Sequence, residues 1–434
     1  MDHVTSLKCL ICGAEYAPDE VPYVCPQHGD EGILDVRYDY GLIARRVNPR
    51  RLARDPDPSI WRYLELLPVD GERFRRWRAS LGGPALAYPI LNVGSTPLYA
   101  PPRLREQLGL PHLWVKDDGR LPSGSLKDRA SAVGVIKARE LGREIIAAAS
   151  TGNAASSLAN LTAASEFRTI IFVPQAAPPA KIAQLLVFGS TVLAVRGTYD
   201  DAFELCLQAA KAYGWYNRNT GYNPYMSEGK KTAAYEICEQ LGWQAPDRIF
   251  VSVGDGCIIG GLHKGLKDLR ALGWINHLPR LMGVQAAGSA ALHDAWQAGL
   301  SPLEMRPIEA HTVADSISAG LPRDRIKALA AVRETGGAYI TVSDEEILAA
   351  IPALGRGCGV FAEPAGAASY AGLLKALAQG LVSRDERVVV LVTGNGLKDV
   401  ASARKSVGEP HLIEPTMDSL QHLMTAMEQG GKLG

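Results

Sequence analysis

Short apolar runs alternate with longer stretches of helical periodicity from about residue 110 onward. The runs rich in β-branched residues are predicted strands, and they lie at residues 144–150, 168–174, 191–195, 248–253, 280–285, 338–342 and 387–392. Helix-compatible stretches follow several of them, at residues 153–165, 180–189, 200–214 and 258–273. Apolar strands separated by helices are typical of parallel sheets that are covered on both faces. The pattern therefore predicts an α/β fold with parallel-type sheets.

Both ends of the chain depart from this pattern. Residues 1–40 hold three of the seven cysteines and predict a separate small module. Residues 41–95 are rich in Arg and Pro and predict a connecting segment with short helices, whose basic run is interpreted as a solvated face. Residues 411–434 predict a loosely held tail.

The charge balance of the chain limits the classes of partner that we expect. The 46 basic residues balance 46 acidic ones, so the chain lacks the electrostatic footprint expected for a nucleic-acid or membrane-surface partner. No apolar run approaches the roughly 20 residues of a membrane span, and the N-terminus has no apolar signal segment, which predicts a cytoplasmic protein. The odd number of cysteines argues against a disulfide framework. Chemistry on a small molecule is therefore the favoured function class.

Four potential metal ligands lie close together in the N-terminal module. Cys9 and Cys12 form a Cys-x2-Cys pair, and Cys25 and His28 form a Cys-x2-His pair. Two such pairs suit the tetrahedral coordination of zinc, so the module is predicted to be zinc-ribbon-like. The alternative is a pair of unligated turns in a ribbon that has lost its metal. If zinc is bound, we expect it to lie far from the chemistry and to leave catalysis largely unaffected.

Two loops carry candidate chemistry in the first half of the α/β region. Lys127 in SGSLKDRAS precedes a helical stretch, where the positive end of the helix dipole disfavours the protonated ammonium and suits a Schiff-base lysine. The alternative is a surface lysine in a charged turn. Ser150, Thr151 and Asn153 follow the first predicted strand and open a helix, whose N–H groups can hold a carboxylate. The alternative there is a simple helix cap.

Two later loops also follow predicted strands. Gly254 and Gly256 in VSVGDGCIIGG allow the backbone to approach a phosphate closely. Ile259 stands where a dinucleotide motif needs its third glycine, and no P-loop lysine follows, so the loop is interpreted as a phosphate cup without nucleotide machinery. Thr393 in LVTGNGLKD would present a hydroxyl at the end of the last strand.

Together these four loops describe a pyridoxal phosphate site. In this order they resemble the tryptophan-synthase-β-like, or fold type II, family of pyridoxal-phosphate enzymes, and more narrowly the threonine synthases. The resemblance covers roughly residues 8–405 and rests on SGSLKDRAS, ASTGN, NPYMSEGKKTAAYEI, the GDGC loop and TGNGLKD. It implies a two-domain fold, in which residues 96–130 and 216–410 form the large cofactor-binding domain and residues 131–215 form the small domain.

The resemblance also implies roles for individual residues. Lys127 would carry the cofactor and shuttle protons, Asn153 would bond the ring oxygen O3′, and Thr393 would face the pyridine nitrogen. The cofactor phosphate would be held by Gly254, Asp255, Gly256, Cys257 and Ile258. The small amino-acid substrate would be bound by Ser150, Thr151, Lys181, Asn223 and Lys230.

The reaction implied by the resemblance belongs to threonine biosynthesis. Such a lyase converts O-phosphohomoserine and water to threonine and phosphate, and its family members are often homodimers. One alternative is β-elimination or β-replacement on serine, threonine or O-phosphoserine, as in dehydratases and cysteate synthase. Another is a non-catalytic regulatory homologue, against which the intact Lys127, Asn153 and Thr393 argue.

Three positions depart from the family pattern around the substrate phosphate. Ala154 replaces the last Thr of the usual STGNT turn, Met226 replaces the arginine of NPxRxEG, and Asp255 stands where an Asn is common. The lost arginine removes a charge-assisted interaction of about 1.5–3 kcal/mol. If the substrate carries a phosphate, another cation must replace this arginine, and the nearest candidates in sequence are Lys181, Lys230 and Lys231.

Overall fold

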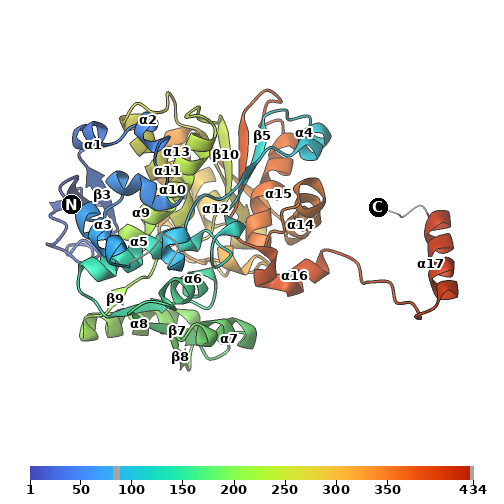
Figure 1. Cartoon of the computed structure of the whole chain (residues 1–434), viewed down its shortest axis with the longest axis horizontal. Helices are drawn as coiled ribbons and strands as arrows, with labels where there is room; N and C mark the ends of the chain where they lie inside the picture. The colour runs from blue at the N-terminus through green and yellow to red at the C-terminus, as the bar shows by residue number, and fades with distance from the viewer. Residues whose placement is uncertain (82–87, 431–434) are drawn as a thin grey trace.

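The structure is a computed structural model that describes residues 1–81 and 88–430 (Figure 1). Its largest sheet has six strands in the order β12-β11-β10-β13-β5-β4. Neighbouring strands run parallel except at the edge, where β4 pairs antiparallel with β5. The strands are β4 (Leu98–Tyr99), β5 (Leu113–Asp117), β10 (Arg248–Ser252), β11 (Arg280–Ala286), β12 (Ala338–Val342) and β13 (Val388–Val392).

Helices cover both faces of this large sheet. Alternate residues of β10 belong to two different cores, because Ile249 and Val251 pack with α11 and α13 whereas Phe250 packs with α15. Successive side chains of a strand point to opposite faces, so an apolar strand without alternation must be covered twice. The helices of this part of the chain are α4 (Pro102–Leu108), α5 (Lys127–Glu140), α9 (Tyr225–Lys230), α10 (Thr232–Gln240), α11 (Cys257–Ala271), α12 (Ala291–Gln297), α13 (Arg325–Thr335), α14 (Asp344–Cys358) and α15 (Pro364–Ala378).

A smaller sheet lies below the large one in Figure 1. It has four parallel strands in the order β8-β7-β6-β9. Its elements are β6 (Ile145–Ala149), α6 (Asn153–Thr162), β7 (Arg168–Pro174), α7 (Pro179–Val187), β8 (Thr191–Val195), α8 (Tyr199–Tyr213) and β9 (Tyr216–Asn217). The seven predicted strands are all present, and the prediction of an α/β fold is confirmed. Strand β5, in the interior of the large sheet, has no counterpart among the predictions.

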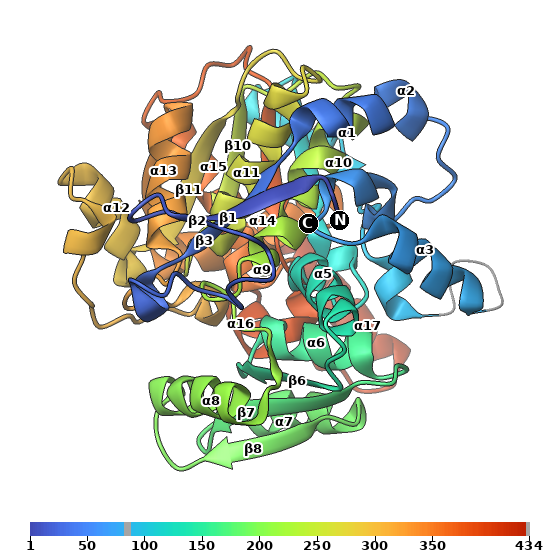
Figure 2. The same cartoon turned by 90° about the vertical axis from the view of Figure 1, so that its left-hand side faces the viewer.

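The N-terminal module is a three-stranded antiparallel sheet in the order β2-β1-β3. Its strands are β1 (Val4–Cys9), β2 (Glu15–Tyr16) and β3 (Leu34–Tyr38), and Figure 2 shows them in front of the large sheet's helices. The Tyr38 hydroxyl donates to Glu228 on α9 at 2.5 Å. Short helices follow, as predicted for the connecting segment: α1 (Tyr40–Arg46), α2 (Pro49–Leu52), a 3-10 helix (Ile60–Leu66), α3 (Gly71–Ser80) and a 3-10 helix (Pro89–Asn92). Part of that segment, residues 82–87, lies outside the described residues.

A buried ionic network holds the start of α5 in place. The Arg129 guanidinium is fully buried and donates to Asp118 at 2.7 Å and to Glu236 at 2.8 Å. Lys116 donates to the same Glu236 at 2.7 Å. Removing one partner of such a network leaves an uncompensated buried charge and costs about 3–5 kcal/mol. Because Arg129 follows Lys127 closely in the first turn of α5, the network fixes the position of that turn.

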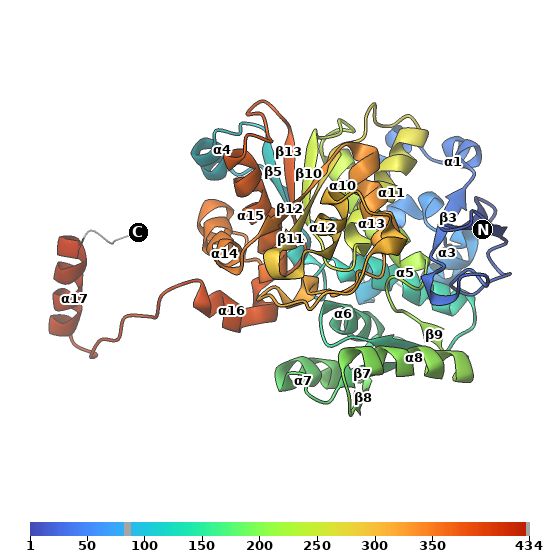
Figure 3. The same ribbon diagram turned by 180° about the vertical axis from the view of Figure 1, so that it is seen from behind.

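The C-terminal part leaves the body of the molecule. After α16 (Val400–Lys405) the chain extends to α17 (Met417–Gly430), which stands apart from the other elements (Figures 1 and 3). This region was predicted only as a tail, and the helix within it was not anticipated. Within residues 1–81 and 88–430, none of the helices combines the length and the apolar character needed to cross a bilayer.

Candidate active site

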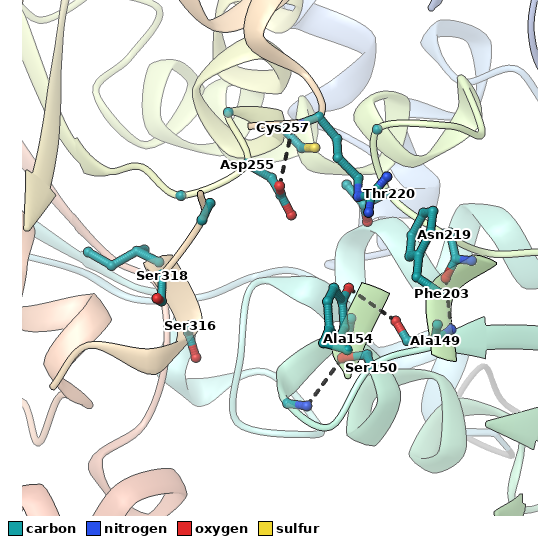
Figure 4. A pocket seen from close by; sticks show the side chains of 18 of the residues that line it. Ala149, Ser150, Ala154, Phe203, Asn219, Thr220, Asp255, Cys257, Ser316 and Ser318 are labelled. Atoms are coloured by element: carbon teal, nitrogen blue, oxygen red, sulfur yellow. Dashed lines mark hydrogen bonds between the residues drawn. The ribbon is translucent and has the colours of Figure 1, made fainter. Parts of the chain in front are cut away.

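A cavity of about 730 Å³ lies where the carboxyl ends of β6 and β10 meet the first turns of α5, α6 and α11. Ligands of parallel α/β sheets bind at this edge. In Figure 4, Ser150 and Ala154 from the small-sheet side face Asp255 and Cys257 from the large-sheet side. The lining includes most of the residues predicted from sequence: Lys127, Ser150, Thr151, Asn153, Lys230 and Gly254 through Ile258.

Lys127 is the first residue of α5 and faces this cavity. The turn before it is tied by Asp128, whose carboxylate accepts a hydrogen bond from the Ser123 backbone at 2.7 Å. Burial lowers the pKa of the Lys127 amine, and the nearby Glu363 carboxyl opposes that shift. A lowered pKa favours the neutral amine that a nucleophilic lysine requires.

The glycine-rich turn between β10 and α11 has the geometry of an anion cup. Gly256 caps α11 with a φ of 88°, in the left-handed region that glycine adopts without strain. A Cβ at Gly254 would come within 2.8 Å of the Ile317 Cα, so the backbone approaches this closely only because a glycine is present. The first N–H groups of α11 have no partner within the helix and carry the positive end of its dipole. The cup therefore suits a phosphate group.

Lys230 lies beside this cup. It ends α9 and is fully buried, and its Nζ has no hydrogen-bond partner among residues 1–81 and 88–430. A Cβ added at Gly261 would lie 2.8 Å from the Lys230 Cβ, so Lys230 packs against the first turns of α11. Burial lowers the pKa of Lys230 to about 8, and the positive charges of Lys127 and Arg218 contribute to this shift.

Arg218 is a cavity residue that the sequence analysis missed. It follows β9 directly, is 1% exposed, and donates to the Ser131 hydroxyl at 3.0 Å and to the Thr220 hydroxyl at 3.1 Å. It forms no ion pair with any residue that the structure describes, and burial lowers the pKa of its guanidinium to about 10. Its position directly after a short strand, at the edge where ligands bind, is the signal that could have identified it.

Asn153 lines the cavity, and Glu363 and Thr393 each contact a residue that lines it. The Asn153 amide donates to Glu363 at 2.8 Å. Thr393 does not line the cavity, but its hydroxyl is 3.4 Å from that of Ser252, which does. Burial raises the pKa of Glu363 to about 7, while Lys127 opposes the shift. Glu363 was not predicted, and its place in the EPAG sequence that opens α15 is the local signal for it.

The two small polar residues of the STGN turn lie at the N-terminus of α6. The Ser150 hydroxyl accepts from the Gly152 backbone at 3.1 Å. Asn219 supports the same turn, because its side-chain oxygen accepts from the Ala149 backbone at 2.9 Å (Figure 4). The N–H groups at the start of α6 are thus presented to the cavity together with the Thr151 side chain.

Two predicted substrate ligands lie elsewhere. Asn223 does not line the cavity, and its side chain instead donates to the Asn217 carbonyl at 2.8 Å and accepts from the Tyr225 backbone at 3.0 Å. Lys181 on α7 forms an ion pair with Asp315 at 2.5 Å and lines a neighbouring cavity of about 530 Å³. Asn223 is therefore not brought to the cup or to the STGN turn, whereas the cavity that Lys181 lines is also lined by Thr151, Gly152 and Asn153 of that turn.

The predicted metal ligands do come together. The ligand atoms of Cys9, Cys12, Cys25 and His28 all lie within 4.8 Å of one another. None of the four residues lines the active-site cavity, as expected for a metal that takes no part in the chemistry, but Glu31, three residues after His28, does line it. The sequence could not show this, since the contact joins residues far apart along the chain.

This fold and this site are those of a pyridoxal-phosphate enzyme. The family described as "Pyridoxal-phosphate dependent enzyme" matches residues 90–394, and the chain belongs to that family. The predicted fold class and cofactor are thereby confirmed.

Within the family, the chain is most informatively compared with two archaeal proteins. It is 39% identical to the threonine synthase of Methanocaldococcus jannaschii over 96% of this chain and 98% of that protein. It is 40% identical to the threonine synthase of Methanosarcina acetivorans over 96% and 97%, respectively. Among solved structures, threonine deaminase isoform 2 of Solanum lycopersicum matches with a TM-score of 0.63 at 21% identity, over 78% of this chain and 93% of that one, which shows the shared fold.

The residues of the cavity fit this cofactor. The cup at α11 offers unpaired backbone donors, and the buried Lys230 Nζ beside it lacks a partner among the described residues. Lys127 opens onto the same cavity, and Asn153 borders it. The cup and Lys230 can bind the phosphate of the cofactor, Lys127 can react with its carbonyl group, and Asn153 can bind its ring oxygen.

Proposed function

We propose that this chain converts O-phosphohomoserine and water to threonine and phosphate. The observation that carries the proposal is a group of three basic side chains, Lys127, Lys230 and Arg218, on the walls of one cavity. None of them forms an ion pair within the described residues. The charge of Arg218 lowers the pKa of both lysines, and that of Lys127 lowers the pKa of Lys230. Relatives named threonine synthase, matched over nearly the whole chain, support the same reaction.

The arrangement of these cations suits two phosphate groups. The cup at Gly254–Ile258 and the adjacent Lys230 account for the cofactor phosphate. Arg218 directly follows β9, lines the same cavity and has no ion pair within the described residues, so it remains available for a second anion. Uncompensated positive charges in a buried site repel one another, and a dianion relieves this repulsion. Serine and threonine carry no phosphate and would leave Arg218 unused.

Each residue of the cavity then has a role toward the substrate. Ser150, Thr151 and the N–H groups of α6 bind the α-carboxylate. Arg218 and Thr220 hold the substrate phosphate until it leaves. Lys127 takes the proton from the α-carbon and returns protons during the later steps. When bound, the cofactor supplies an electron sink for the negative charge that develops on the substrate.

Arg218 also explains how the site functions without the arginine that is absent at Met226. Met226 is fully buried, and its methyl carbon lies close to Gly134 on α5. Lys231 cannot substitute, because it forms buried ion pairs with Glu228 at 2.5 Å and Asp268 at 2.8 Å. Arg218 supplies a guanidinium from a different point of the chain, and its planar fork can bind a phosphate with two hydrogen bonds.

A panel of amino acids tests the proposal. Purified protein is supplied in parallel with O-phosphohomoserine, O-phosphoserine, serine and threonine, and phosphate, threonine and 2-oxo acid are measured. We expect phosphate and threonine in equal amounts from O-phosphohomoserine alone. Release of 2-oxo acid from serine or threonine, without phosphate from O-phosphohomoserine, would instead establish β-elimination. Turnover of no substrate by cofactor-loaded protein would support a regulatory homologue.

We also propose that the enzyme acts in the cytoplasm as a homodimer on this small substrate, without nucleic-acid or membrane partners. The balanced charge supports the absence of such partners. Exposed apolar side chains after the last β-strand support self-association: Leu397, Val400, Val407, Leu412, Met417 and Met424. Light scattering on the purified protein measures the mass and decides between monomer and dimer.

A further inference from the structure

The cysteine and histidine cluster of the N-terminal module has the dimensions of a tetrahedral zinc site. The Sγ atoms of Cys12 and Cys25 are 3.9 Å apart, and His28 Nδ1 lies 3.5 Å from Cys25 Sγ and 3.9 Å from Cys9 Sγ. Zinc–sulfur and zinc–nitrogen bonds of roughly 2.3 and 2.05 Å imply ligand separations of roughly 3.8 Å for two sulfurs and 3.5 Å for sulfur and nitrogen.

The surroundings of the cluster support the charged form of the ligands. The Ile11 backbone donates to Cys9 Sγ at 3.4 Å, and the Tyr16 hydroxyl lies 3.1 Å from Cys25 Sγ. Hydrogen bonds to ligating sulfurs orient them and stabilise thiolates. Three thiolates and an imidazole form a donor set that favours zinc over calcium or magnesium.

The module that carries this cluster lines the active-site cavity at one place and contacts the segment behind Arg218 at another. Asp30 and Glu31, directly after His28, line the cavity, and Glu31 forms an ion pair with Arg325, another lining residue. On the other side, the Tyr23 hydroxyl accepts a hydrogen bond from the backbone of Asn217 at 2.9 Å.

The second contact adjoins the substrate subsite. Asn217 immediately precedes Arg218, the residue proposed to hold the substrate phosphate. The Tyr23 ring also packs against Tyr216 and Tyr222, with ring centroids 5.9 and 5.5 Å apart. Both ends of the stretch that contains Arg218 and Thr220 are therefore supported by one residue of the module.

Little besides the cluster holds these contact residues in place. Between β2 and β3 the regular structure is limited to a 3-10 helix (Gly29–Glu31), and the buried apolar side chains are Val21, Cys25 and Ile33. A segment with so small a core depends on a crosslink to fix its conformation, and a structural metal supplies that free energy. Metal binding is thus coupled to the positions of Tyr23, Asp30 and Glu31.

We propose that a zinc ion held by Cys9, Cys12, Cys25 and His28 maintains one wall of the active-site cavity, so that metal occupancy sets the affinity for the substrate. The inference rests on the proposed function for the identity of the cavity and of its substrate. The metal takes no part in the chemistry, because its ligand set is complete without an open position. It acts through Tyr23 and Glu31 on the geometry of the Arg218 region and of the cavity mouth.

The experiment separates metal binding from contact with the cavity. Cys12→Ser removes a ligand, and Cys358→Ser, in a half-buried cysteine at the end of α14, is the matched control. The double variant Tyr23→Ala/Glu31→Gln keeps all four ligands but removes the hydrogen bond to Asn217, the ring packing of Tyr23 and the ion pair with Arg325. For each holoenzyme we measure metal per chain, cofactor absorbance, KM and kcat for O-phosphohomoserine, and the rate at which hydroxylamine removes the cofactor.

We expect one zinc per chain in the wild type, the control and the double variant, and none in Cys12→Ser. Cys12→Ser and the double variant should both retain the cofactor, raise KM about five-fold or more with kcat within about two-fold, and lose the cofactor faster to hydroxylamine. The control should behave as wild type in every measurement.

Three results would overturn the inference. The first is wild-type protein, prepared without chelator, that contains no stoichiometric metal. The second is metal loss that leaves both KM and the hydroxylamine rate unchanged. The third is a double variant with wild-type values, which would mean that the metal acts only on stability. If O-phosphohomoserine is not turned over at all, the proposed function fails, whereas metal content and the hydroxylamine rate still decide this inference.

Discussion

Replacing Arg218 by glutamine tests how the cavity holds the substrate phosphate. Arg218 is 1% exposed, and its guanidinium donates only to the hydroxyls of Ser131 and Thr220 within the described residues. Glutamine retains a donor but removes the charge. A hydrogen bond to a charged group contributes about 1.5–3 kcal/mol, and about 1.4 kcal/mol corresponds to a tenfold change, so KM for O-phosphohomoserine should rise roughly 10- to 150-fold.

The electrostatics of the cavity predict a second effect of the same change. Arg218 contributes to the lowered pKa of both Lys127 and Lys230. Removing its positive charge therefore raises both pKa values, which an NMR titration of the cofactor-free protein can follow at Lys230. An Arg218→Lys variant restores a point charge without the planar fork and should have a KM between those of wild type and Arg218→Gln.

The assay is steady-state release of phosphate, with cofactor absorbance measured on every variant. Arg54→Gln, at an exposed arginine outside the cavity, is the matched control and should leave KM unchanged. An Arg218→Gln variant with a KM within about two-fold of wild type would refute the assignment of the phosphate subsite. Loss of cofactor absorbance in this variant would show instead that Arg218 serves the cofactor.

Three further predictions concern the lysine, the buried acid and the ionic network. Lys127→Ala should abolish the cofactor that borohydride fixes to the chain, whereas the exposed Lys405→Ala should retain it, as mass spectrometry of reduced protein would show. Glu363→Gln should gain stability relative to wild type as the pH rises from about 5 to about 8. The pKa of Glu363 is raised from 4.5 to about 7, so the folded cofactor-free wild type keeps a proton that the unfolded chain has lost, and its free energy of unfolding falls over this range. Denaturant titrations should show that the difference between the two proteins changes by about 3 kcal/mol, and a pH-independent difference would contradict the prediction. Arg129→Met should lower the free energy of unfolding by about 3–5 kcal/mol or prevent folding, because it removes the ion-pair partner of two buried carboxylates. The control Arg404→Met, at an exposed ion pair, should change stability by less than about 1 kcal/mol. A small loss for Arg129→Met would mean that the network does not hold the start of α5.

Local features of the sequence were sufficient to predict seven of the strands and the loops that line the cavity. The strand that reads VVVLV is apolar at every position, which only a strand covered on both faces tolerates, and it is the buried β13. Gly254 and Gly256 mark a close backbone approach that other residues do not permit, and they form the turn before α11. The residues that form such a pattern lie within a few positions of one another, so the pattern can be recognised in the sequence without the tertiary structure.

Only the tertiary structure decided which charges remain available for ligands. Lys230 and Lys231 are neighbours in sequence and indistinguishable there, yet Lys231 is neutralised by two buried carboxylates and Lys230 faces the cavity without a partner among the described residues. Arg218 has no distinguishing motif in the sequence, and it matters because it directly follows β9 and lines the same cavity as the cup. The contact of Glu31 with the cavity likewise joins distant parts of the chain. Burial and ion pairing depend on which elements pack together, and no local pattern in the sequence records that packing.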